Sequence, residues 1–191
     1  MSVTFIAKAK LPTKHVDFDV HVFMHNEQEH LVLTKGQFNQ QDVVLTRVHS
    51  ECLTGDSLFS LRCDCGPQLE FAMQEMAKQD KALLIYLRQE GRGIGLAEKI
   101  KAYQLQDTGV DTYDANLKLG HPADNRNYQM LEAVFKHFAI KNINLMTNNP
   151  DKMTAIEQAG ININKRIPIK AGHNPHNQHY LQTKIDKFNH L

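Results

Sequence analysis

Apolar and polar residues alternate in the N-terminal part of the chain, which is the pattern of strands with one buried face. In residues 16–22, valine and phenylalanine alternate with aspartate and histidine. This segment is predicted to be a strand with His21 on its solvent face. Apolar runs at 31–33 and 43–45 predict two further strands, separated by turn-forming residues. We therefore expect an antiparallel meander that leads directly into the segment 47–51.

From residue 67 onward the apolar spacing is that of helices alternating with short buried strands. The predicted helices are 67–79, 96–105, 128–139 and one that begins at Pro150 behind the cap residue Asn149 and ends at Gly160. The predicted strands are 82–87, 143–146 and 161–167. The segment 106–127 is predicted to be rich in loops, and a compact domain usually keeps such a long segment for function.

This order of elements predicts an α/β (α+β) fold. We expect a mixed sheet, built from the N-terminal antiparallel meander and β–α units, with helices packed on it. A length of 191 residues without repeats or a linker predicts a single domain over residues 1–191, of which about 168–191 form a polar C-terminal tail.

Composition narrows the function classes. A hydrophobic content of 41% is typical of a globular protein. A net charge of +1 gives no reason to expect general binding to nucleic acids or membrane surfaces. No apolar run approaches the roughly 20 residues of a membrane span, and residues 1–13 lack the apolar region of a signal peptide. We therefore expect a cytoplasmic protein that has no nucleic-acid or membrane partner.

The three cysteines of the chain, Cys52, Cys63 and Cys65, lie within one short stretch. Their spacing is neither the paired pattern of a structural zinc ribbon nor a redox motif. Three sulfur ligands leave tetrahedral zinc one open position, which is the arrangement of a catalytic site. Zinc in such a site lowers the pKa of a bound water toward about 7. We predict a zinc site with these three ligands; the alternative is that they are small buried side chains.

A glycine-rich segment, Gly91–Gly95, lies between a predicted buried strand and a predicted helix. In this setting backbone N–H groups and a helix N-terminus can bind phosphate. The motif lacks both the dinucleotide fingerprint and a Walker lysine, so a tight turn is an equal alternative. The flanking Arg88 and Arg92 favour an anion, because guanidinium groups match phosphate oxygens.

Several motifs in series resemble those of GTP cyclohydrolase II, the entry enzyme of riboflavin synthesis. They are RVHSECLTGD at 47–56, LRCDCG at 61–66, RQEGRGIGL at 88–96, residues 119–128 and LMTNNP at 145–150. The resemblance covers nearly the whole chain, and 191 residues leave no room for the fused synthase domain of many relatives. It departs from the family at His121, where an aromatic or apolar residue is more usual, and in a tail rich in histidine.

The resemblance implies a reaction and a set of residues. The family opens the imidazole ring of GTP, releases C8 as formate and splits off pyrophosphate. By motif, Cys52, Cys63 and Cys65 would hold one zinc per chain, and magnesium would accompany the triphosphate. The residues implied to bind GTP are Arg47, Val48, His49, Ser50, Glu51, Gln68, Glu90, Gly91, Arg92, Thr112, Thr147 and Lys152. A homodimer is implied by the resemblance alone.

Three further residues carry catalytic roles by resemblance. Asp124 would be the proton acceptor, and Tyr103 would assist at the same centre or else be a half-buried helix residue. Arg126 would act as nucleophile at the α-phosphate. A guanidinium has no lone pair to offer, so an electrostatic clamp on phosphate oxygens is physically easier, and the covalent step stays open.

Two other functions compete with this hypothesis. His49-x-Glu51 upstream of two cysteines also opens the signature of zinc nucleoside deaminases, but the proline and cysteine spacing that should follow is absent. A catalytically inactive GTP-binding relative is the second alternative, although a mere binder would not need Tyr103, Asp124 and Arg126 together. In the tail, Pro175 interrupts His173, His176 and His179, which disfavours a second metal site there.

Overall fold

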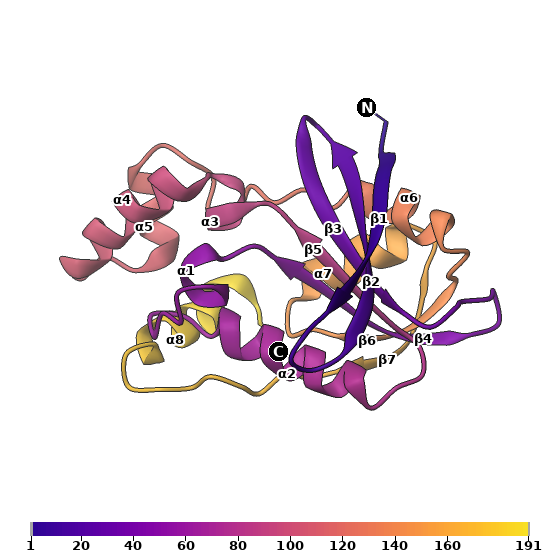
Figure 1. Cartoon of the computed structure of the whole chain (residues 1–191). Coiled ribbons are helices and arrows are strands. Elements are labelled where there is room, and N and C mark those ends of the chain that lie inside the picture. The colour runs from indigo at the N-terminus through magenta and orange to yellow at the C-terminus, as the bar shows by residue number, and fades with distance from the viewer. Residues whose placement is uncertain (1, 191) are drawn as a thin grey trace. The chain divides into compact units, whose positions relative to one another are not determined.

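The computed structural model describes residues 2–190, which fold as two compact units interleaved along the sequence (Figure 1). The first, here the sheet unit, takes the chain up to His49, Glu70–Arg88 and Tyr128–Ile169. The second, here the cysteine unit, takes Ser50–Leu69, Gln89–Asn127 and the chain from Lys170 on. None of the helices in the described residues is long and apolar enough to cross a membrane.

The sheet unit is built on one mixed sheet of seven strands in the order β1-β2-β3-β5-β4-β6-β7. The strands are β1 (Thr4–Pro12), β2 (Asp17–His25), β3 (Gln28–Lys35), β4 (Val43–Ser50), β5 (Ala82–Leu87), β6 (Asn142–Met146) and β7 (Asn162–Ile167). The pairs β1–β2, β2–β3 and β3–β5 are antiparallel, and β4–β6 and β6–β7 are parallel. The predicted fold class is confirmed.

The third predicted strand does not continue the meander. Residues 43–45 begin β4, which is separated from β3 by β5 and pairs in parallel with β6. From Val44 to His49 every residue of β4 is buried. Burial on both faces is typical of interior strands among parallel neighbours rather than of one-sided hairpins, so β4 takes an inner position. The antiparallel meander instead consists of β1, β2 and β3. Strand β1, whose residues are all exposed, was not predicted.

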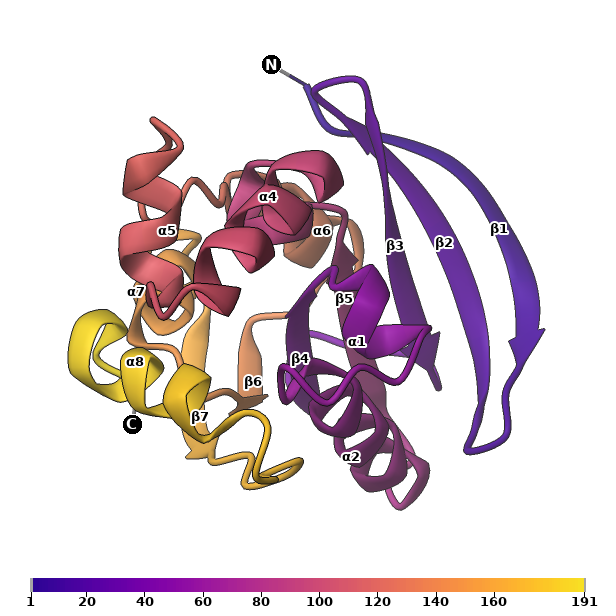
Figure 2. The same ribbon diagram turned by 90° about the vertical axis from the view of Figure 1, so that its left-hand side faces the viewer.

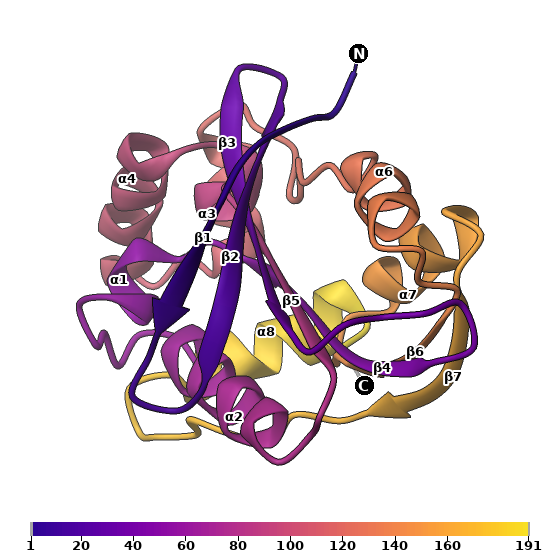
Figure 3. The ribbon, with the colours of Figure 1, turned by 45° about the vertical axis from the view of Figure 1, so that its right-hand side comes forward.

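Helices cover both faces of the sheet, as Figure 3 shows. On one face, α6 (Met130–His137) and α7 (Pro150–Gln158) pack through Phe135 and Ile156 against strand residues such as Val44 and Ile85. Alternate strand residues such as Leu84 point to the other face. There α2 (Cys65–Ala77) lies, and Lys35 Nζ of β3 donates 2.9 Å to its Ala77 carbonyl.

His21 was predicted on the solvent face and is buried, with only 5% of its surface exposed. Along β2 the burial follows His21, Phe23 and His25 rather than the valines. The reason is that Phe138, just after α6, packs edge-on against the His21 ring at 4.9 Å, so the face that looked polar is covered by a helix end. Its Nε2 lies 3.1 Å from the Thr34 hydroxyl.

The cysteine unit consists mainly of helices and loops. Besides the first turns of α2 it contains α1 (Leu53–Asp56), α3 (Glu90–Gly93), α4 (Leu96–Asp107), α5 (Thr112–Lys118) and α8 (Gln178–Phe188). Figure 2 shows α4 beside α5 and α8 below α5. Helix α5 lies inside the segment predicted as loop-rich. The Asp111 carboxylate caps it by accepting from the Tyr113 and Asp114 N–H groups, a local signal that the prediction missed.

The segment predicted as a polar tail contains α8, which is tied to the rest of the cysteine unit by charge. Lys187 Nζ lies 2.7 Å from Asp111 and 3.1 Å from Asp114. Lys184 Nζ lies 2.5 Å from Asp64, the residue between two of the cysteines. These ion pairs explain how a helix with few apolar residues is held in place.

Candidate active site

The three cysteine side chains meet in the cysteine unit. Their sulfur atoms all lie within 4.8 Å of one another, and Cys52 Sγ is 3.7 Å from Cys63 Sγ. Cys52 directly precedes α1 and Cys65 begins α2, so two helix starts position them. Cys52 and Cys63 are buried and Cys65 is half-buried. The sequence predicted this cluster, and the structure brings its members together.

Two glycines allow the sulfur atoms to approach the backbone. A β-carbon on Gly55 would lie 2.8 Å from Cys63 Sγ and 3.1 Å from Cys52 Sγ. A β-carbon on Gly66 would lie 2.2 Å from the Gly55 carbonyl oxygen. The distances of 2.8 and 2.2 Å are too short for a real β-carbon, so the turn of α1 and the start of α2 pack this closely because both positions are glycine.

The donor set fits a metal such as zinc. Within residues 2–190, the sulfur cluster is joined by no carboxylate or imidazole that would close a fourth side. Hydrogen bonds from Cys63 and Cys65 lower the pKa of Cys52, and the bond to Cys52 raises the pKa of Cys63 to about 11. A divalent cation would favour the thiolate form of all three, because a coordinating thiol is deprotonated.

Lys99 of α4 reaches the sulfur cluster and was not predicted. Its Nζ donates to Cys52 Sγ at 3.2 Å and to Glu90 Oε1 at 2.7 Å. Burial acts to lower the pKa of Lys99, but the negative charges of Cys52 and Glu90 outweigh it and raise the pKa. The sequence held one signal for it, since Lys99 precedes Tyr103 by one helical turn and therefore shares its face.

Tyr103, predicted as catalytic, also lies beside the cysteines. Its hydroxyl is 3.3 Å from the Thr54 hydroxyl, which in turn is 3.8 Å from Cys52 Sγ. The Arg62 guanidinium lies 4.5 Å above the Tyr103 ring. Burial raises the pKa of Tyr103, so its hydroxyl keeps its proton at neutral pH and can donate a hydrogen bond.

The glycine-rich loop folds tightly on itself. Gly91, Arg92 and Gly93 all have positive φ, of 62°, 61° and 88°. The N–H groups of Gly91, Gly93 and Gly95 donate to Glu90 Oε1, the Gln89 carbonyl and the Glu90 carbonyl. Because these amides are used within the loop, the structure favours the tight-turn alternative for them. The side chain of Arg92 is then the group of this loop that could contact an anion.

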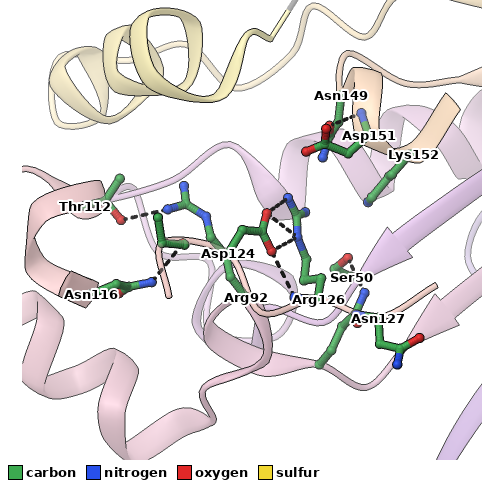
Figure 4. A network of polar contacts seen from close by, with 12 residues as sticks. Ser50, Arg92, Thr112, Asn116, Asp124, Arg126, Asn127, Asn149, Asp151 and Lys152 are labelled. Carbon is green, nitrogen blue, oxygen red and sulfur yellow. Dashed lines mark hydrogen bonds and ion pairs between the residues drawn. The ribbon is translucent and has the colours of Figure 1, made fainter. Parts of the chain in front are cut away.

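Arg92 is oriented by two contacts within the cysteine unit. Its Nη1 lies 3.5 Å from the Thr112 hydroxyl at the start of α5 (Figure 4). Its guanidinium also stacks on the Phe188 ring of α8, at 3.9 Å from the ring centre. Arg92 and Thr112, both predicted to bind substrate, are thus brought together.

Asp124 and Arg126 form a forked ion pair in the segment after α5. The Arg126 Nε donates to both carboxylate oxygens of Asp124 at 2.9 Å, and Arg126 Nη2 donates to Oδ2 as well (Figure 4). Burial acts to raise the pKa of Asp124, but its hydrogen bonds with Arg126 lower it. The charge of Arg92 acts in the same direction. Asp124 is therefore a carboxylate at neutral pH, as a proton acceptor must be.

Other predicted residues of the cysteine unit are held by polar contacts. Gln89 Nε2 donates 3.0 Å to the Ser50 hydroxyl, and Gln89 Oε1 accepts from the Asn127 N–H at 3.1 Å. Gln68 Nε2 donates 2.5 Å to the Asp64 carboxylate. Glu51 is half-buried next to Cys52. Gln89 and Asp64, which sequence reasoning missed, thus orient the predicted residues Ser50 and Gln68 by hydrogen bonds.

The remaining predicted residues belong to the sheet unit, where they lie at the C-terminal end of β4, directly after β6 and on α7. Arg47 Nη1 donates 2.9 Å to the Met146 carbonyl, and Lys152 Nζ donates 2.8 Å to the Val48 carbonyl. The Val48 side chain is part of the apolar core, so Val48 can meet a ligand only through its backbone. The other two of this group are His49, stacked on Tyr86 at 5.4 Å, and Thr147, bonded to the Asn149 N–H.

Comparison with known proteins shows the family of this chain. A model of the GTP cyclohydrolase II family matches residues 4–168. The chain belongs to the GTP cyclohydrolase II family. It is an enzyme of that type, as the series of motifs predicted.

Similar proteins agree over almost the whole length. The chain is 51% identical to a GTP cyclohydrolase-2 of Neisseria meningitidis serogroup C, over 97% of this chain and 95% of that one. It is 52% identical to that of Saccharophagus degradans, over 100% and 96%. A solved structure, the two-domain 3,4-dihydroxy-2-butanone 4-phosphate synthase RibBX from A. baumannii, has a TM-score of 0.49 at 16% identity over 89% of this chain and 40% of that one.

His121, where the chain departs from the GTP cyclohydrolase II motif, has a local partner. Its Nε2 lies 3.2 Å from Glu98 Oε2 on α4. The tail histidines His173, His176 and His179 are exposed. In this cyclohydrolase II chain the imidazole of His121 therefore supports the packing of the segment after α5 against α4.

Proposed function

We propose that this chain is a zinc-dependent GTP cyclohydrolase II that catalyses the first step of riboflavin biosynthesis. It opens the imidazole ring of GTP and releases C8 as formate together with pyrophosphate. The remaining product is 2,5-diamino-6-ribosylamino-4(3H)-pyrimidinone 5′-phosphate. Family membership supports the substrate, and the sulfur cluster supports the metal.

The cysteine cluster is the observation that carries the proposal. Three sulfur donors, joined by no carboxylate, imidazole or further thiol among the described residues, are what a catalytic zinc needs, since a structural site would be closed. When bound there, zinc would supply a Lewis acid that makes water nucleophilic near neutral pH. Cys52, Cys63 and Cys65 would hold one zinc per chain.

Asp124 and Arg126 suggest how substrate binding and proton transfer are linked. In the ion pair, the Arg126 guanidinium lowers the pKa of Asp124 and so makes it a weak base. A phosphate oxygen of GTP would compete for the same guanidinium, because phosphate and carboxylate fit its fork equally well. We propose that this exchange frees the Asp124 carboxylate, raises its pKa and lets it accept a proton.

The same pair favours an electrostatic role for Arg126. A guanidinium held against a carboxylate keeps its proton and its charge, which makes a nucleophilic attack on the α-phosphate harder. We propose that Arg126 clamps phosphate oxygens, and a guanylylated arginine remains the alternative. Mass spectrometry of enzyme quenched during turnover distinguishes the two, since only the covalent route gives a nucleotide adduct on the peptide with Arg126.

The residues proposed to bind GTP are those that the family motifs imply. The cysteine unit carries Ser50, Glu51, Gln68, Glu90, Gly91, Arg92 and Thr112 together with Tyr103, and the sheet unit carries Arg47, Val48, His49, Thr147 and Lys152. Magnesium is proposed on the triphosphate, whose charge it would neutralise. We also propose one domain over residues 1–191, a homodimer and a cytoplasmic location, on the sequence and the family resemblance.

The decisive experiment follows the C8 atom. GTP labelled with ¹³C at C8 is incubated with the zinc-loaded protein and magnesium, and formate is detected by NMR while pyrophosphate is measured by a coupled assay. We expect both products. Release of ammonia without formate would support a deaminase, and GTP binding without either product would support the inactive relative.

Asp124→Asn provides the matched control for the chemistry. It removes the proton acceptor but leaves the cysteines, so the metal content should stay at one per chain while formate release falls by about 10²–10⁴-fold. Asp186→Asn makes the same change at an exposed position on α8 and should have no effect. Full turnover by Asp124→Asn would remove Asp124 from the mechanism.

A further inference from the structure

Lys99 connects the sulfur cluster to a residue of the proposed substrate site. It comes from α4 and has only 8% of its surface exposed. Its ammonium lies 3.2 Å from Cys52 Sγ and 2.7 Å from Glu90 Oε1. A buried ammonium is costly to desolvate unless it is paired, and here both partners are negatively charged when the cysteines bind a metal.

Glu90 holds the lysine in one place. Its Oε2 accepts from the Leu53 N–H at 2.6 Å, directly after Cys52, and its Oε1 accepts from the Gly91 N–H at 2.8 Å. The carboxylate is therefore fixed by backbone at both oxygens. A fixed carboxylate on one side and Cys52 on the other define where the ammonium must lie.

The net charge of the proposed metal centre explains why a cationic side chain beside Cys52 would matter. Three thiolates outweigh the double charge of zinc by one negative charge, and sulfur donates electron density to the metal. Both effects make the ion a weaker Lewis acid than one held by neutral ligands. A hydrogen bond to a ligand atom withdraws part of that density, and partners of this kind tune a metal as strongly as they orient its ligands.

We propose that Lys99 is a positioning residue of the metal centre, whose ammonium offsets the excess negative charge of the three thiolates through Cys52 Sγ. The inference rests on the proposed metal site and deepens it. Lys99 does not touch the substrate in this role. It acts through Cys52 by keeping the metal electron-poor, and the ion pair with Glu90 supplies the rigidity.

The alternative is that Lys99 only balances the buried charge of Glu90. The two roles predict different behaviour of the metal itself, which cobalt(II) reports because its sulfur-to-cobalt charge-transfer band depends on the electron density at sulfur. The experiment uses full-length protein loaded with cobalt, and Lys99→Met as a variant that keeps the aliphatic stem without the charge. Lys101→Met, an exposed lysine on the same helix that pairs only with Glu98 at the surface, is the matched control.

We expect the charge-transfer band of Lys99→Met to move to lower energy, because sulfur without the ammonium gives up electrons more easily. Turnover of the zinc form should fall by about 10–100-fold at unchanged metal content. Lys99→Arg should restore the band and most of the turnover. Lys101→Met should match the wild type in both. Glu90→Gln keeps an oxygen that can accept from Lys99, so its band should move less than that of Lys99→Met.

Several outcomes would overturn the inference. A band that does not move in Lys99→Met, or that moves equally in Glu90→Gln, would leave Lys99 as a partner of Glu90 alone. If Lys99→Met does not fold, Lys99→Gln tests the same charge, and an unshifted band there contradicts the proposal. Failure of the wild-type protein to bind cobalt through its cysteines would overturn the metal site and this inference together, whereas bound cobalt with an unresponsive band would overturn the inference only.

Discussion

The sheet unit and the cysteine unit are stabilised in different ways. In the sheet unit, residues such as Phe135, Ile143 and Leu145 are completely buried in one apolar core. In the cysteine unit, ion pairs such as Lys184–Asp64 and Lys99–Glu90 join loops and short helices around three sulfur atoms. The stability that an apolar core provides falls with the volume that a substitution removes, whereas a buried charge depends on one particular partner. The cysteine cluster is thus built in the unit where loss of a single partner has the more specific effect.

Metal removal should have the largest effect, and it should be confined to the cysteine unit. Cysteine-bound zinc contributes on the order of 10–16 kcal/mol of binding free energy in small domains, much of it coupled to folding. We expect Cys63→Ser to lose zinc and formate release, and to speed hydrogen exchange in the peptides of α1 and the start of α2. Mass spectrometry of exchange resolves the two units.

Exchange in β5 and β6 should stay unchanged in the same sample, which is the internal control. If Cys63→Ser loosened both units equally, the units would not differ in what stabilises them. Retention of one zinc per chain would contradict the ligand assignment of Cys63.

A core substitution in the sheet unit should give the reverse pattern. Phe135→Ala removes a fully buried ring from α6 and should lower the free energy of unfolding by about 3–5 kcal/mol. We expect faster exchange in the strands and helices of the sheet unit while zinc content remains at the wild-type value. Urea unfolding measures the loss. Phe135→Leu, which keeps most of the volume, serves as the milder variant and should cost less.

Acid should weaken the sheet unit through two buried histidines. Burial lowers the pKa of both His21 and His30 from 6.5 to about 4. The unfolded chain therefore binds these protons at higher pH than the folded chain does. Their contribution to stability is complete above about pH 6.5 and is lost as the pH falls toward about 4.

Urea unfolding at a series of pH values measures this slope. His21→Gln should flatten the slope between pH 6.5 and 4, and the exposed His176→Gln should leave it unchanged. An identical slope in His21→Gln would mean that His21 titrates normally in the folded protein.

The smallest expected effect concerns the contact of α8 with the glycine loop. Phe188→Ala removes the ring under the Arg92 guanidinium and beside Tyr113, a cation–π contact of about 1 kcal/mol. If Arg92 binds substrate as proposed, KM for GTP should rise by about fivefold with little change in kcat. Ile185→Ala, an exposed apolar residue on the same helix, is the control. A KM equal to that of the wild type would show that α8 does not orient Arg92.

Local patterns made much of the sheet unit predictable. The strand 82–87 and the cap of α7, where the Asn149 side chain accepts from the Asp151 N–H, depend on neighbouring residues only. Pairing between distant segments was not predictable, because β5 inserts between β3 and β4 although it follows both in the sequence and α1 and α2 come before it. The predicted exposure of His21 was wrong for the same reason, since the end of a helix far along the sequence covers its side chain.

In the cysteine unit the residue types were easier to predict than their surroundings. The grouping of three cysteines in the sequence indicated the cluster that forms. Lys99 and α8 were missed because their partners Cys52 and Asp64 are remote in sequence. Charged residues also give no apolar periodicity that would indicate such contacts.

Gly55 and Gly66 offer a way to recognise loss of function in related chains. A side chain at Gly55 would meet the sulfur atoms of Cys63 and Cys52, and one at Gly66 would meet the Gly55 carbonyl oxygen, so either substitution would have to move α1 or the start of α2. A sequence that retains all three cysteines but has substituted one of these glycines is therefore expected to bind the metal more weakly. In a related chain, the presence of both glycines therefore indicates an intact metal site more reliably than the presence of the three cysteines alone.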